Sequence, residues 1–171
     1  ATDKMLLKYT PSGTLIWTYT ATVFSGGYGY YGDFAVDHHS NNIYIVEGFN
    51  PGSGSNVVKI NSSAVQLAYF AGDPNFREMW RISFARCTNQ AVIAGGGTTS
   101  PTYQTCYLDT NLTALTMVQF APTTDCCHDV SCLALDNYGN AYEMTNQSQL
   151  YPTFFNNKIV KLPLPAMLPI T

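Results

Sequence analysis

A four-residue phrase that returns about every fifty residues is the strongest constraint on this chain. Leu-Lys-Tyr-Thr at residues 7–10 becomes Val-Lys-Ile-Asn at 58–61 and Val-Lys-Leu-Pro at 160–163, with a weaker copy, Cys-Tyr-Leu-Asp, at 106–109. Self-similarity at a period of this size is the signature of stacked supersecondary units. The repeat therefore predicts an array of similar units, and it favours a binding surface over a single catalytic cleft.

The segments between turn signals read as strands. They are rich in β-branched and aromatic residues, they are separated by Gly, Pro, Asn and Ser, and long runs with helical periodicity are absent. Residues 5–10 and 15–21 flank a Pro-Ser-Gly turn, and residues 34–37 and 43–47 form a second hairpin. Each repeat thus holds four strands in hairpins, which is the strand pattern of a β-propeller blade.

The repeat predicts an all-β fold, a β-propeller of about 3.5 four-stranded antiparallel blades. The expected divisions are a half blade at 1–24, blades at 28–70, 79–120 and 128–165, and an exit linker or edge strand at 166–171. Propellers close with about four to eight blades. We therefore expect the chain to be part of a larger propeller, or to be completed by the remainder of the propeller, another copy or another protein chain.

The composition limits the partners and the cellular location that can be expected for this chain. Only 11% of the residues are charged, the formal net charge is −3 and no Lys/Arg run occurs, which argues against nucleic-acid binding. No apolar run approaches the roughly 18–20 residues of a membrane span, so a membrane-spanning chain is not expected. A polar complement of Thr, Ser, Asn, Gln and Tyr favours an extracellular or cell-surface location.

Cysteines and glycosylation signals fit the same location. Because the number of cysteines is odd, we expect one or two disulfides and at least one free thiol; the candidates are Cys87, Cys106, Cys126, Cys127 and Cys132. Three Asn-x-Ser/Thr sites fall in expected turns, and they are glycosylation candidates in a host with that machinery: Asn61, Asn111 and Asn146.

The chain resembles the bacterial repeats called seven-bladed β-propeller, or SBBP, repeats. Residues 3–17 carry the Asp, the hydrophobic pair with Lys, the Pro-x-Gly and the apolar-aromatic strand of that pattern. Residues 28–37 supply the Gly-rich loop and the Val-Asp strand, and residues 133–142 match the same inner hairpin closely. The third repeat departs, because Arg86 stands where the inner-strand Asp is expected and Cys106–Leu108 lacks the Lys.

The resemblance implies a non-catalytic extracellular module for adhesion, scaffolding or assembly at a bacterial cell surface. It carries no catalytic residues to transfer, so we expect no enzyme and no cofactor. The cluster at residues 126–129 with Cys132 matches no common zinc spacing, so no metal site is predicted. Asp37 and Asp136 repeat at one position of the blade, and we expect them to satisfy backbone donors of turns.

Two alternatives stay open beside this reading. One is a carbohydrate-binding or polysaccharide-active propeller, for which flat aromatic side chains would supply the contact surface; the candidates are Tyr28, Tyr30, Tyr31 and Phe49. A glycosidase needs a pair of carboxylates that flank one bond. Glu47 and Glu143 instead fall near equivalent hairpin positions of different blades, which indicates a structural role. The other alternative is a subunit of an extracellular filament joined through open blade edges.

Overall fold

The fold is seen in a computed structural model. It describes residues 5–21, 30–49, 56–73, 76, 78–96, 105–118, 128–147 and 158–162. Every regular element in these ranges is a strand and none is a helix, so the predicted all-β class is confirmed. The predicted linker or edge strand at 166–171 lies outside the described residues.

The described strands form four antiparallel sheets in chain order. Sheet 1 contains β1 (Met5–Tyr9) and β2 (Leu15–Thr20); sheet 2 contains β3 (Tyr30–Asp37), β4 (Asn42–Phe49), β5 (Val57–Ile60) and β6 (Gln66–Phe70); sheet 3 contains β7 (Glu78–Ala85), β8 (Gln90–Gly96), β9 (Thr105–Leu108) and β10 (Ala114–Val118); sheet 4 contains β11 (His128–Leu135), β12 (Ala141–Gln147) and β13 (Lys158–Leu162). One residue pair, Phe49 with Glu78, joins the ends of sheets 2 and 3.

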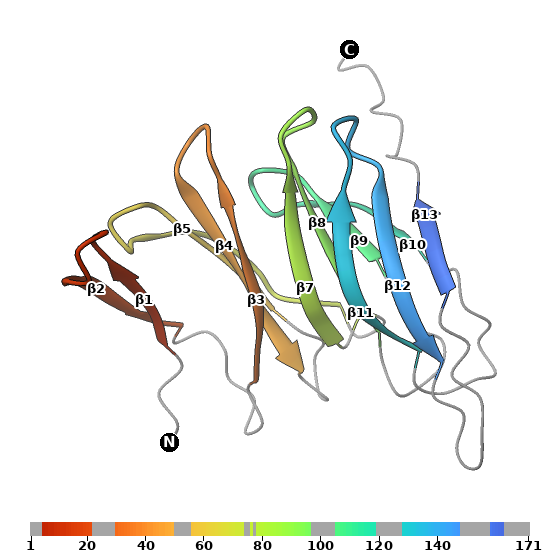
Figure 1. Ribbon diagram of the computed structural model, residues 1–171, viewed down its shortest axis with the longest axis horizontal. Helices are drawn as coiled ribbons and strands as arrows, with labels where there is room; N and C mark the ends of the chain where they lie inside the picture. Colours follow the sequence, from red (N-terminus) through yellow and green to blue (C-terminus); the bar gives the residue numbers. More distant parts are fainter. Residues whose placement is uncertain are drawn as a thin grey trace.

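The four sheets follow one another across the molecule, from sheet 1 (red) to sheet 4 (blue), as Figure 1 shows. The first strand of sheet 2, β3, lies against the first strand of sheet 3, β7, which in turn lies against β11 of sheet 4. A separate apolar cluster fills each of the three spaces between neighbouring sheets. Stability therefore comes from face-to-face burial between consecutive sheets.

The register of the strands shows which positions are equivalent. Tyr44 pairs with Lys59 in sheet 2, and Tyr142 pairs with Lys161 in sheet 4. In sheet 3, Val92 and Tyr107 occupy these two positions. The prediction that Arg86 replaces the inner-strand aspartate in the third repeat is wrong. Ala85 pairs with Gln90 as Asp37 pairs with Asn42, so Ala85 occupies that position and Arg86 begins the turn.

The outer hairpins of sheets 1, 2 and 3 share one turn design. Each turn spans five residues, namely 10–14, 61–65 and 109–113. The backbone amide of the first residue donates to the carbonyl of the fifth, and the carbonyl of the first residue accepts the amide of the fourth. The fourth residue has positive φ in all three and is Gly13, Ala64 or Leu112. Because the backbone bonding is the same, the second residue of each turn presents its carbonyl at an equivalent place in its sheet.

A bulge interrupts the first strand of sheets 2, 3 and 4 at one position, at residues 32, 80 and 131. In sheet 2 this residue is Gly32, and a Cβ built there would lie 2.1 Å from the carbonyl oxygen of Met79 in β7. A glycine within a strand often marks such a close approach of two backbones. Asp33, next along β3, accepts the Ile82 amide of β7 at 3.3 Å, so the two first strands are also joined by a hydrogen bond.

Candidate functional site

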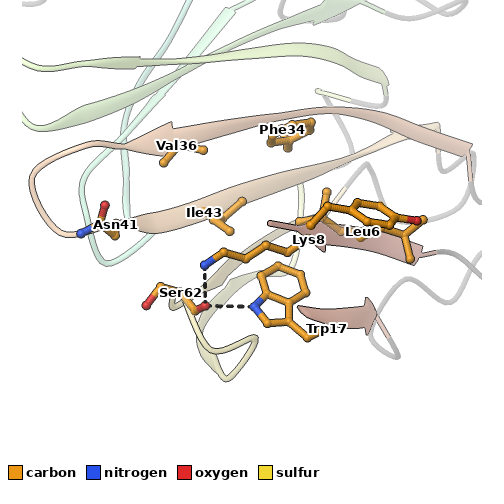
Figure 2. Close-up of a pocket in the computed structure, with 10 residues that line it drawn as sticks. Leu6, Lys8, Trp17, Phe34, Val36, Asn41, Ile43 and Ser62 are labelled. Atoms are coloured by element: carbon orange, nitrogen blue, oxygen red, sulfur yellow. Dashed lines mark hydrogen bonds between the residues drawn. The ribbon is translucent and has the colours of Figure 1, made fainter. Parts of the chain in front are cut away.

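A hollow of about 600 Å³ lies between sheets 1 and 2. Figure 2 shows it bounded by strands of both sheets. Its wall is mainly apolar and aromatic and includes Leu6, Trp17, Phe34, Val36 and Ile43. A concave, mostly apolar site with a few polar groups is the usual form of a ligand pocket.

Two polar side chains from sheet 1 close one side of this hollow. The Lys8 ammonium donates to the carbonyl oxygen of Ser62 at 3.2 Å, and the Trp17 indole N–H donates to the same oxygen at 3.0 Å (Figure 2). Lys8 also lies over the Trp17 ring, 5.7 Å from its centroid. The described lining contains no carboxylate, thiol or imidazole. The hollow therefore offers flat aromatic surface for binding and no acid–base pair of its own.

A smaller hollow of about 270 Å³ lies between the β7–β8 turn and the end of β11. Arg86, Cys87 and Asp136 line it. Asp136 is not free to act as a base, because its carboxylate accepts the amides of Tyr138 and Asn140, both at 2.9 Å. The hydrogen bonds from Asn140 hold the pKa of Asp136 below its ordinary value.

The repeated lysine makes the same contact between two successive pairs of sheets. Lys8 of sheet 1 donates to Ser62 in the outer turn of sheet 2, and Lys59 of sheet 2 donates to the Thr110 carbonyl in the outer turn of sheet 3, at 2.6 Å. Ser62 and Thr110 are both the second residue of the shared turn design. We call this contact the lysine–turn contact. It explains why the phrase recurs with Lys at its second position.

The lysine–turn contact leads to a graded prediction. Lys59 is buried, so Lys59→Met is expected to lower the free energy of unfolding by about 2 kcal/mol through loss of a charged hydrogen bond. Lys8 is only partly buried and Trp17 still binds the same carbonyl, so Lys8→Met should cost less than about 1 kcal/mol. Urea unfolding of both variants measures the difference, and equal losses would contradict the assignment.

Two glutamates are fully buried between sheets. In sheet 2, Glu47 accepts the side-chain amide of Asn56, and the Glu47 backbone amide donates to the Asn56 carbonyl at 2.9 Å. In sheet 4, Glu143 accepts the Thr105 hydroxyl of sheet 3 at 2.7 Å, and its second oxygen has no hydrogen-bond partner among the described residues. Burial raises the pKa of Glu143 to about 8.

The aromatic residues predicted to bind ligand fall at the margin of what the structure describes. Tyr28 lies outside the described residues. Tyr30, Tyr31 and Phe49 are strand residues at one end of the β3–β4 pair, where Tyr30 pairs with Phe49 and Tyr31 pairs with Glu47. Trp17 and Phe34 line the larger hollow, and the sequence analysis did not select either of them as a ligand contact.

The described cysteines form no disulfide. Cys87 and Cys132 are exposed free thiols and Cys106 is a buried one, so none of these three candidates takes part in the predicted disulfides. Cys126 and Cys127 lie outside the described residues. Burial raises the pKa of the Cys106 thiol to about 12, which keeps it protonated and unreactive. The reason that pairing fails is topological, since Cys106 faces the cluster between sheets 2 and 3.

The glycosylation candidates differ in setting. Asn61 opens the outer turn of sheet 2, and its side-chain oxygen accepts the amides of Ser63 and Val65, both at 2.9 Å. Asn111 is exposed in the corresponding turn of sheet 3, and Asn146 lies in β12. Asn111 is therefore more open than Asn61, which is half-buried.

The prediction for the repeated aspartates is confirmed. Asp37 accepts the His39 amide at 2.9 Å and the Ser40 hydroxyl, and Asp136 holds its own turn in the same way. Burial is the largest single influence on the pKa of Asp37 and raises it. The hydrogen bonds from Ser40 and His39 together outweigh burial, so the pKa of Asp37 lies below its ordinary value. These carboxylates are therefore structural.

Comparison with known proteins assigns no family to this chain. No protein-family model matches the chain, and no curated protein matches it significantly. In the part of the chain that the structure describes, no group of three His, Cys, Asp or Glu residues is arranged to hold a metal ion. The same part contains no helix of the length and apolarity that crossing a membrane requires.

Proposed function

We propose that this chain is a non-catalytic β-propeller module that serves adhesion, scaffolding or assembly at a bacterial cell surface. One observation carries the proposal: the same lysine–turn contact joins sheet 1 to sheet 2 and sheet 2 to sheet 3, and the first strands of sheets 2, 3 and 4 lie side by side. Blades around a propeller axis repeat their contacts in this way, because each blade meets only its two neighbours. The low charge content and the Thr-, Ser- and Asn-rich composition support an extracellular location.

Retention on cells tests the proposed role. The purified chain, labelled at its amino terminus, is incubated with intact bacterial cells and with cells stripped of surface protein and polysaccharide. We expect saturable retention on intact cells that falls after stripping. Equal retention of the chain and of an unrelated domain of similar size and charge would contradict a surface role.

A carbohydrate-binding module is the second candidate, and the hollow between sheets 1 and 2 favours it. Phe34 lines this hollow with half of its surface exposed, and it belongs to none of the apolar clusters between sheets. Exposed aromatic rings of this kind stack on the apolar faces of sugars.

Replacing Phe34 tests the carbohydrate candidate. If the hollow binds glycan, Phe34→Ala is expected to weaken binding on a glycan array by about tenfold, the equivalent of one lost aromatic contact, with little change in unfolding. Tyr138→Ala, at an exposed turn of sheet 4, is the control. Glycan binding that is the same in both variants would exclude this hollow as the sugar site.

A further inference from the structure

We call the face of sheet 4 that points away from sheet 3 its outward face. It carries a lysine, Lys161, that does not make the lysine–turn contact of its counterparts with any described residue. Lys161 occupies the position of Lys8 and Lys59, and its ammonium lies 5.4 Å from the centroid of the Tyr142 ring, as that of Lys59 lies 5.5 Å from Tyr44. Lys8 and Lys59 each donate to a turn of the next sheet. Lys161 has no hydrogen-bond acceptor in the part of the chain that the structure describes.

The apolar positions around Lys161 are also uncovered. Ile159 is 76% exposed, whereas Val57, at the equivalent position of sheet 2, is fully buried against sheet 3. Ala134 is exposed, whereas its counterpart Ala35 is buried. In sheet 2 these positions are covered by a neighbouring sheet. The outward face of sheet 4 therefore has the composition of an inter-sheet surface, and none of the described strands covers it.

The outward face of sheet 1 is the complementary surface. Leu7 is 42% and Tyr9 52% exposed, whereas Val58 and Ile60, at the same positions of sheet 2, are fully buried against sheet 1. The outer turn of sheet 1 also has the shared turn design. The carbonyl of Pro11 stands where Ser62 and Thr110 accept a lysine in sheets 2 and 3.

We propose that the outward face of sheet 4 binds the outward face of sheet 1 of a second copy, with Lys161 donating to the Pro11 carbonyl. One face of the chain supplies the cation and the other supplies the acceptor, so a second copy satisfies both with the contact already used twice inside the chain. Such an interface is heterologous: it closes a ring if the rotation permits and otherwise extends a filament. This inference rests on the proposed function, since it names the partner of an assembly module.

Charge placed on either face should abolish the association. Ile159→Glu and Leu7→Glu each put a carboxylate into one half of the interface, and each variant alone is expected to have the mass of the 18.8 kDa monomer. Leu67→Glu, at an exposed apolar position in the middle of the array, is the matched control and should associate like the unmodified chain. Lys161→Met should weaken association by about tenfold, as expected for loss of one charged hydrogen bond.

Mixing the two charged variants gives the sharpest test. Each retains one intact face, so an equal mixture of Ile159→Glu and Leu7→Glu should form a dimer, and no larger species, when followed by light scattering over a concentration series. An unmodified chain that stays monomeric throughout would overturn the inference, as would a Leu7→Glu variant that associates alone. Circular dichroism checks that each variant is folded.

The failure of this inference can be told from the failure of the proposed function. A monomeric chain that is still retained on intact cells would overturn head-to-tail association and leave the surface role standing. An associating chain that shows no specific retention on cells would support the interface and contradict the surface role. The two experiments therefore report on different claims.

Discussion

The free energy of unfolding is expected to fall by several kcal/mol as the pH rises from about 4.5 to about 8, and Glu143→Gln is expected to remove most of this fall. Burial between sheets 3 and 4 raises the pKa of Glu143 from 4.5 to about 8. Between these values the unfolded chain has released the proton and the folded chain retains it. The unfolded state then binds fewer protons, so stability decreases as the pH rises.

The size of the effect follows from the same two pKa values. A rise in the pKa of Glu143 from 4.5 to about 8 corresponds to on the order of 5 kcal/mol of unfolding free energy. This contribution is fully present below pH 4.5 and is lost above pH 8. Glu143→Gln retains an acceptor for the Thr105 hydroxyl but cannot ionise. The variant should therefore resemble the unmodified chain below pH 4.5 and be the more stable of the two above pH 8.

Urea unfolding at pH 5, 6.5 and 8 measures this dependence. Thr105→Val is the informative control, because the Thr105 hydrogen bond lowers the pKa of Glu143 and its loss should extend the fall in stability to higher pH. Identical pH profiles for the unmodified chain and Glu143→Gln would show that this carboxyl is hydrated, and they would contradict the sheet 3–sheet 4 packing described here.

Gly32→Ala is expected to lower the free energy of unfolding by about 3 kcal/mol, the upper end of the usual cost of overpacking. The added methyl would meet the Met79 carbonyl oxygen at 2.1 Å, and a backbone atom cannot turn aside as a flexible side chain can. Strand β3 or β7 must move, which disturbs the Asp33 hydrogen bond to Ile82 and the cluster between sheets 2 and 3.

Gly13→Ala separates this collision from ordinary glycine effects. Gly13 has φ +86° and open space where a Cβ would lie, so its replacement should cost only about 1–2 kcal/mol, through backbone strain. Thermal or urea unfolding of the two variants compares the two costs. A Gly32→Ala variant that loses no more stability than Gly13→Ala would show that β3 and β7 do not approach as closely as described.

Local chemistry made the hairpins predictable. Pro, Ser and Gly at residues 11–13 specify a turn without reference to the rest of the chain, and Asp136 binds the amides of its own turn. The fifty-residue period likewise placed the lysines of β1, β5 and β13 at equivalent positions, which the strand register bears out. The turns depend on neighbouring residues and the lysine positions on the repeat itself, so the sequence alone predicts both.

The candidate site depended on contacts between sheets, which periodicity does not encode. The sequence comparison placed Glu47 and Glu143 near equivalent positions, but the register makes Ile45 the counterpart of Glu143, two residues from Glu47. The sequence indicates a buried strand residue at Phe34, yet this side chain is half-exposed and lines the hollow between sheets 1 and 2. The acceptors of the lysines are backbone carbonyls, which carry no residue signal.

A crystal structure of the chain at a concentration where it associates tests the central claim most directly. We expect the first strands β3, β7 and β11 to be arranged around one axis, with the lysine–turn contact between sheets 1 and 2 and between sheets 2 and 3. We also expect a neighbouring copy whose Pro11 carbonyl lies within hydrogen-bonding distance of the Lys161 ammonium. Sheets that do not share an axis, or a sheet 4 face left uncovered in the associated form, would contradict the account.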